Sequence, residues 1–185
     1  VQSLLAGEKI SSKLIEVEHA PLVSVLSFVL VISHYHFLLM QNLKGGIPKF
    51  MQKLNMGFAK YFNLKNERND ALFASKYKAV WVKDSFQLDA VVRYINLTNS
   101  LDVFQPGWRE DGLKNIEAAF KFLSEYSFSS FPDLSGRRKS LFLAPKEVLE
   151  EFLGEGIMGK QEGLSEFVKD YLNQNRNFSS PLFLE

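Results

Sequence analysis

The sequence contains no cysteine among its 185 residues. It can therefore form neither a disulfide framework nor a thiolate metal site, and its stability does not depend on an oxidising compartment. Long apolar runs are also missing. The longest, 22–32, has 11 residues and is interrupted by Ser24 and Ser27, whereas a helix needs about 20 residues to cross a bilayer. We therefore expect a cytoplasmic protein with no membrane segment.

Acidic residues are scarce in one part of the chain. The block 44–83 contains nine basic residues and only two acidic ones, Glu67 and Asp70. The whole-chain net charge of +1 hides this excess, because 13 acidic and nine basic residues follow from Glu110 onward. A basic block with so few internal counter-charges favours a polyanionic partner, although most lysine-bearing helix faces are simply solvated.

The overall composition is that of a folded protein. Hydrophobic residues make up 46% of the chain and charged residues 23%, which excludes the disordered and fibrous classes. A length of 185 residues allows one substantial core with an appended segment, but not two large domains.

The first half of the chain indicates an α+β fold with an antiparallel sheet. Apolar runs predict strands over 22–32 and 34–41, either joined by a hairpin through Ser33 or forming one broken strand. Gly45, Gly46 and Pro48 then introduce the clearest helix, predicted over 47–62.

Further elements are predicted along the rest of the chain. The β-branched and aromatic segment YKAVWV at 77–82 favours a third strand. Asp84 or Ser85 can cap the next helix, which should run to about Leu97 and carry Tyr94. Three more helical patterns follow, near 113–125, 145–153 and 164–173.

Two histidines stand at i and i+2 in the second predicted strand. Side chains two residues apart on a strand point to the same face, so the rings of His34 and His36 can converge on one ion while Tyr35 packs into the other face. Taken alone, such a pair is more often two surface histidines than a metal site.

Four segments in order resemble the single-tyrosine transposases that carry a histidine-hydrophobic-histidine (HUH) motif. They are FVLVISHYHFLLMQ, GGIPKFMQKLNMGFAKYFN, ALFASKYKAVWV and LDAVVRYINL. The branch that they resemble most is the REP-associated tyrosine transposases. The similarity runs from about residue 22 to residue 131, where it includes YSFSSF, and so covers more than half of the chain.

The resemblance implies a ferredoxin-like (RRM-like) antiparallel sheet with packed helices. Its tyrosine segment, R-Y-I-x-L, corresponds to 93–97, so Tyr94 would be the nucleophile. His34 and His36 would hold a divalent metal, Mg²⁺ or Mn²⁺, with Thr98 at the position of a third ligand. The implied activity is nicking and strand transfer of single-stranded or hairpin DNA through a 5′-phosphotyrosine, in the cytoplasm of a bacterium or archaeon.

The basic block supplies candidate contacts to DNA. Exposed lysines would bind the phosphates, and aromatic side chains in the same block would stack on unpaired bases, although most aromatics of the chain belong to the core. The lysines are Lys49, Lys53 and Lys60 in a narrow arc of the predicted helix 47–62, followed by Lys76 and Lys78; the aromatics are Phe73, Tyr77 and Trp81.

We divide the chain into a catalytic domain over 1–131 and a helical C-terminal extension over 132–185. The first strand of the family would precede Val1, so we expect part of the catalytic domain upstream of the sequence. A monomer and a homodimer are both compatible with the sequence.

The sequence departs from the family pattern at several positions. Thr98 stands where relatives often carry Asn or Gln, and a hydroxyl is a poorer ligand than an amide oxygen; Asn99 lies one step further round the helix, where proline is common. Asp70 and Ser75 replace expected glycines, and the residues at 32–33 replace a Pro-Asn pair. An alternative therefore stays open: a catalytically impaired or domesticated protein that binds DNA hairpins on the same fold.

Overall fold

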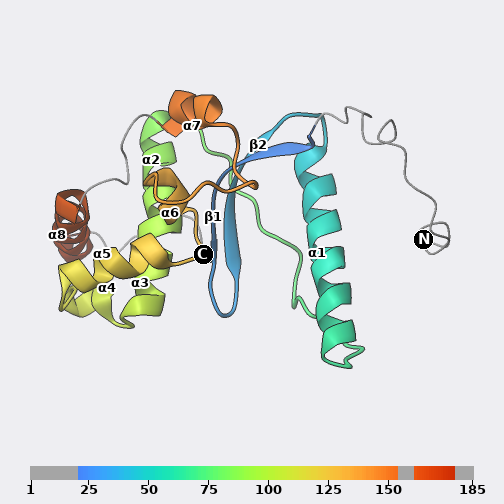
Figure 1. Ribbon diagram of the computed structural model, residues 1–185, viewed down its shortest axis with the longest axis horizontal. Coiled ribbons are helices and arrows are strands. Elements are labelled where there is room, and N and C mark those ends of the chain that lie inside the picture. Colours follow the sequence, from blue (N-terminus) through green and yellow to red (C-terminus); the bar gives the residue numbers. More distant parts are fainter. Residues whose placement is uncertain (1–20, 154–160, 178–185) are drawn as a thin grey trace.

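The computed structural model describes residues 21–153 and 161–177 and has a mixed α+β architecture. A β-hairpin stands at the centre, with one long helix on one side and a group of shorter helices on the other (Figure 1). None of the described helices has both the length and the apolar character needed to cross a membrane.

The hairpin consists of β1 (Val23–Leu30) and β2 (Tyr35–Gln41), paired antiparallel. Both predicted strands are confirmed, and the turn between them is the hairpin alternative. The strands stop short of the predicted ends because the Val31 amide donates to the His34 carbonyl at 3.0 Å, which closes the turn. The register pairs Val29 with His36 and Leu30 with Tyr35.

The edge of β1 that does not pair with β2 is partly covered by residues 128–130. Ser129 forms an isolated antiparallel bridge with Val29, and the Ser130 amide donates to the Phe28 carbonyl at 2.9 Å. This bridge is the only strand-like pairing outside the hairpin in the described ranges. A complete ferredoxin-like sheet is therefore not seen among the described residues.

Helix α1 (Gly46–Lys65) covers the face of the hairpin on which Tyr35 lies. Gly46 is required by close packing, because a Cβ there would lie 2.1 Å from the Leu22 carbonyl oxygen. The predicted helix 47–62 is confirmed, but its apolar stripe packs only in its first half. Met51 is buried, whereas Phe58 and Tyr61 stay 49% and 57% exposed.

The prediction of a strand over 77–82 was wrong. These residues have no regular secondary structure, and all but Val82 are exposed. A strand needs a neighbouring edge that accepts and donates backbone hydrogen bonds, and no such edge pairs with the segment among the described residues. β-branched and aromatic content alone did not reveal this, because β-propensity mostly reports packing context.

A continuous helical rod follows and carries Tyr94. It consists of α2 (Ser85–Arg93), the π-turn η3 (Tyr94–Thr98) and α3 (Asn99–Phe104). The predicted cap is confirmed, since the Asp84 carboxylate accepts the Gln87 amide at 2.8 Å. The remaining helices are α4 (Trp108–Asp111), α5 (Ile116–Glu125), α6 (Phe131–Leu134), α7 (Lys146–Leu153) and α8 (Gln161–Asn177), and they include the three predicted ones.

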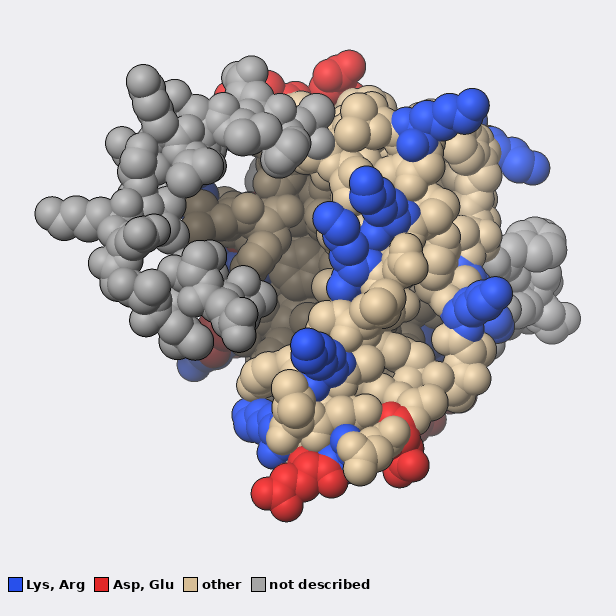
Figure 2. Space-filling model, turned by 90° about the vertical axis from the view of Figure 1, so that its right-hand side faces the viewer, with Lys and Arg blue, Asp and Glu red and all other residues tan. Residues whose placement is uncertain are grey.

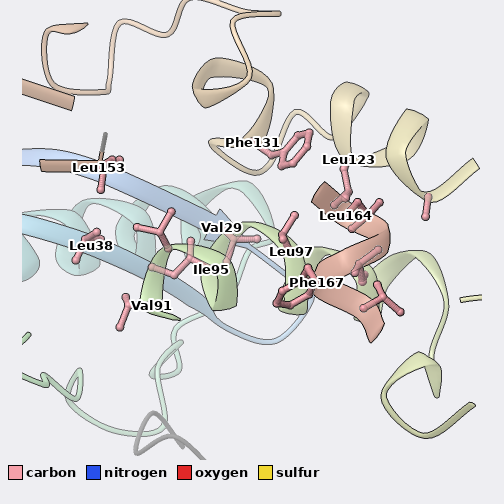
Figure 3. Close-up of a cluster of buried hydrophobic side chains, with 14 of the residues drawn as sticks. Val29, Leu38, Val91, Ile95, Leu97, Leu123, Phe131, Leu153, Leu164 and Phe167 are labelled. Carbon is pink, nitrogen blue, oxygen red and sulfur yellow. The ribbon is translucent and has the colours of Figure 1, made fainter. Parts of the chain in front are cut away.

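One hydrophobic cluster joins the hairpin to the last helix (Figure 3). Val29 and Ile95 bring the sheet and the π-turn together, and Leu101 continues the cluster into α3. At its far end Trp108, which is fully buried, packs its ring 6.2 Å from that of Phe167 on α8. The C-terminal helices therefore share their core with the tyrosine helix.

Candidate functional site

The two histidines lie side by side at the turn end of the hairpin. Their ring centroids are 5.0 Å apart and the rings are nearly perpendicular. His34 is exposed, and its Nδ1 is 3.0 Å from the Ser33 hydroxyl. His36 is half-buried because its strand partner Val29, on the same face, is fully buried against the tyrosine helix.

His36 has the environment of a neutral imidazole. Burial, and secondarily the neighbouring His34, lowers the pKa of His36 to about 4. Its Nε2 is buried and has no hydrogen-bond partner within the described structure. A buried polar atom without a partner is costly, and a neutral imidazole with an available lone pair is a common metal ligand. The ring is therefore suited to hold a cation.

Tyr94 meets His36 from the helix that covers this face of the sheet. The two ring centroids are 5.3 Å apart at 78°, and the tyrosine side chain is half-buried. Tyr94 begins the π-turn, and its carbonyl accepts both the Asn99 backbone amide and, at 2.8 Å, the Asn99 side-chain amide. The extra residue of a π-turn is often found at functional sites. Here the two hydrogen bonds from Asn99 hold the backbone carbonyl of Tyr94 in place.

Thr98 is the last residue of the π-turn, and its side chain is 2% exposed. Asn99 is similarly buried, and its amide nitrogen already bonds to Tyr94. Among the side chains that the structure describes, residues 21–153 and 163–173, no group of three His, Asp or Glu side chains could hold a metal ion. The side chains at the end of the π-turn, on Thr98 and Asn99, offer a hydroxyl and an amide.

A buried polar cluster fastens the tyrosine helix to the sheet. The Asn96 amide donates to the Ser27 hydroxyl at 2.7 Å, and the Ser130 hydroxyl donates to the Asn96 carbonyl oxygen at 2.7 Å. The Ser27 and Ser130 hydroxyls are 2.9 Å apart, and all three residues are fully buried. Sequence reasoning missed this cluster, although Ser27 and Asn96 each interrupt an apolar run.

Arg109 is a second feature that the sequence did not reveal. Its hydrogen bonds to Asp102 raise the pKa of Arg109 above its ordinary range, although burial acts in the opposite direction. The guanidinium is therefore held in its charged form beside the Asp102 carboxylate on α3.

The five predicted DNA-binding lysines are all exposed. Those on α1 lie across the hairpin from Tyr94, because Tyr35 on the opposite sheet face bonds to Asn55 of that helix. Figure 2 shows this side of the molecule, where basic side chains are spread over the surface and acidic ones gather at its margins. The five predicted lysines are Lys49, Lys53 and Lys60 on α1, and Lys76 and Lys78 on the segment after it.

The site residues fall inside a match to a known family. The model of the family described as "Transposase IS200 like" matches residues 5–98, half of the chain, and the match includes His34, His36, Tyr94 and Thr98. Comparisons with curated proteins and with solved structures gave no significant match. With the histidine pair and the tyrosine brought together on one face of the hairpin, the match shows that the chain belongs to the IS200-like transposase family.

Proposed function

We propose that the protein nicks single-stranded or hairpin DNA with Tyr94 and transfers the strand through a 5′-phosphotyrosine. The observation that carries the proposal is the contact of the Tyr94 ring with His36, 5.3 Å between centroids, next to His34. Three side chains of the types that a tyrosine transferase needs meet at one place, and they come from a hairpin and a helix about 60 residues apart in sequence.

In the proposed reaction the Tyr94 oxygen attacks the phosphorus of the scissile phosphodiester. A bond forms between the tyrosine oxygen and phosphorus, the bond to the 3′ oxygen breaks, and the phenolic proton passes to solvent while the leaving oxygen becomes a 3′-OH. The phosphotyrosine is still a phosphodiester, so a second 3′-OH can attack it and release Tyr94. Because His36 has its pKa lowered to about 4, it is a poor base and is better suited to bind a cation.

His34 and His36 would hold a divalent metal, Mg²⁺ or Mn²⁺, with Thr98 as the proposed third ligand. The neutral His36, with a buried Nε2 that lacks a described partner, fits this role. When bound, such an ion supplies positive charge to the non-bridging phosphate oxygens. Arg109, on the short helix α4 that follows the tyrosine helix, would add a fixed positive charge.

The exposed lysines would hold the DNA outside the reacting centre. Lys49, Lys53 and Lys60 on α1 provide charge on the other side of the hairpin from the tyrosine, where a DNA hairpin stem could extend. Such contacts with phosphates position the DNA without reading its sequence. The cytoplasm of a bacterium or archaeon is the setting that we propose.

A second function is favoured by Thr98. This residue is 2% exposed, and its hydroxyl replaces the amide expected at this position, so the ion site would be weaker than the family pattern. The alternative is a protein that binds DNA hairpins without cleaving them. Both functions predict DNA binding, but only the first leaves protein attached covalently to DNA.

The test is a denaturing gel of the protein incubated with end-labelled hairpin oligonucleotides and Mg²⁺ or Mn²⁺. Wild type should give a slow protein–DNA band, and Tyr94→Phe should bind the oligonucleotide equally well but give no band. Tyr61→Phe is the matched control, because Tyr61 is an exposed tyrosine on α1 and its loss should change nothing. If wild type forms no adduct with either metal, and Thr98→Asn does not restore one, the hairpin-binding function replaces the enzymatic one.

A further inference from the structure

The segment between α1 and α2 combines positive charge with exposed aromatic rings. Residues 71–83 contain three lysines, Lys76, Lys78 and Lys83, and no acidic residue. The Trp81 side chain is 80% exposed, and Phe86, just after the segment, is 82% exposed. Phe73 is different: its ring packs against Tyr35, 6.1 Å between centroids, and so belongs to the fold.

The exposure of Trp81 contrasts with the second tryptophan of the chain. Trp108 is fully buried, its indole nitrogen donates to Asp102 at 2.9 Å, and its ring stacks beside Tyr171. Among the described residues no aromatic ring packs against Trp81 or Phe86. Aromatic side chains bring about 150–250 Å² of surface each to an interface. Two of them left outside the core are available to cover a ligand.

Phe86 has a defined position relative to Tyr94, and Trp81 precedes it by five residues in the sequence. The Asp84 cap fixes the start of α2, and Phe86 lies in its first turn. Tyr94 follows eight residues later on the same rod, which at 1.5 Å per residue is about 12 Å along the helix axis. A few nucleotides of a single strand span that distance.

The chemistry of the segment favours unpaired nucleic-acid bases over other partners. Every base has a face that stacks on an aromatic ring, and a neighbouring lysine neutralises the phosphate that follows. Bases paired in a duplex are already stacked on their neighbours and cannot use these rings. An apolar protein partner would not require Lys76, Lys78 and Lys83 beside the rings, and the one acidic residue between the rings, Asp84, has its carboxylate engaged in capping α2.

We propose that Trp81 and Phe86 form a stacking platform for unpaired bases next to the phosphate that Tyr94 attacks. The inference rests on the proposed DNA-cleaving function and assigns to it the place where the single-stranded flank is held. It gives the enzyme a means to choose a strand with an unpaired flank over a closed duplex, which lysines alone do not provide.

The two tryptophans make the platform directly measurable. Trp81 is exposed and Trp108 is buried, so a ligand stacking on the platform changes the emission of Trp81 and leaves that of Trp108. Titration of wild type with a 12-nucleotide oligothymidylate should quench and blue-shift the fluorescence. A blunt duplex of the same length should not.

Variants then test how much each ring contributes to binding. The affinity of each variant is measured by the fluorescence anisotropy of a labelled oligothymidylate. Trp81→Leu and Phe86→Leu should each weaken binding roughly 5- to 100-fold, and Trp81→Phe should recover most of the loss. Tyr61→Leu, at an exposed aromatic on α1, should bind as wild type. Because both platform rings are outside the core, thermal unfolding of the variants should match wild type.

The adduct gel separates this proposal from the function on which it rests. Adduct formation by wild type, with unchanged fluorescence and equal affinity of Trp81→Leu, overturns the platform and leaves the cleavage proposal standing. Equal quenching by the duplex also overturns it. Quenching and loss of affinity without any adduct support the platform on a hairpin-binding protein. If wild type binds no oligonucleotide, both proposals fall.

Discussion

Removal of the Ser130 hydroxyl should lower the free energy of unfolding. The hydroxyl lies 2.9 Å from that of Ser27, accepts the Phe28 amide at 3.0 Å and donates to the Asn96 oxygen at 2.7 Å, all in a fully buried region. Ser130→Ala leaves the Phe28 amide and the Asn96 oxygen without these partners. An unsatisfied buried group costs about 1–3 kcal/mol, so we expect a loss of about 2–4 kcal/mol.

Equilibrium unfolding in urea measures this loss. With a slope of about 2 kcal/mol/M for a chain of this size, the midpoint should fall by roughly 1–2 M at an unchanged slope. Ser140→Ala is the control, because the Ser140 hydroxyl accepts only the Phe142 amide at an exposed site, and its midpoint should hardly move. A midpoint for Ser130→Ala equal to that of the control would refute the view that this cluster fastens the tyrosine helix.

Two further predictions concern the flanks of the site. Asp84→Ala removes the cap of α2 and should lower the unfolding free energy by about 1 kcal/mol, while Asp70→Ala, which caps no helix, should not; equal urea midpoints for the two variants would argue against the cap. The second prediction is a pH effect, measured with chelator present. Because the pKa of His36 falls from 6.5 to about 4 on folding, the unfolded chain binds the proton first. Its contribution to stability is therefore full above pH 6.5 and is lost as the pH falls towards 4. His36→Gln should flatten the pH dependence of the urea midpoint over that window, and an unchanged slope would contradict the assigned environment.

Local patterns predicted the parts of the site that depend on neighbouring residues. The i, i+2 spacing placed His34 and His36 side by side on one strand face, and Tyr35 packs against α1 on the other face, as strand geometry requires. The cap at Asp84 was equally readable, because an N-cap acts within three residues. The role proposed for Tyr94 rests on the family resemblance and not on its local pattern.

Features that depend on distant pairing were not predictable in this way. The segment 77–82 has strand-like composition, but whether it pairs depends on an edge elsewhere in the chain, and the described structure has none for it. The cluster of Ser27, Asn96 and Ser130 joins residues 69 and 103 positions apart in sequence. A lone polar residue in an apolar run signals a buried hydrogen bond, but it does not name the partner.

The buried polar cluster and the histidine pair together set where Tyr94 can lie. Asn96 bonds to Ser27 on β1, whereas Tyr94, two residues earlier, contacts His36 on β2. Residues two apart on a helix project in different directions, so the helix runs over the hairpin with one anchor on each strand. Rotating the helix to press Tyr94 closer to the histidines would pull Asn96 out of two buried hydrogen bonds. Each such bond costs about 1–3 kcal/mol to lose. In the proposed reaction we therefore expect the phenol to approach the phosphate by rotation of the Tyr94 side chain, with the backbone held at the π-turn.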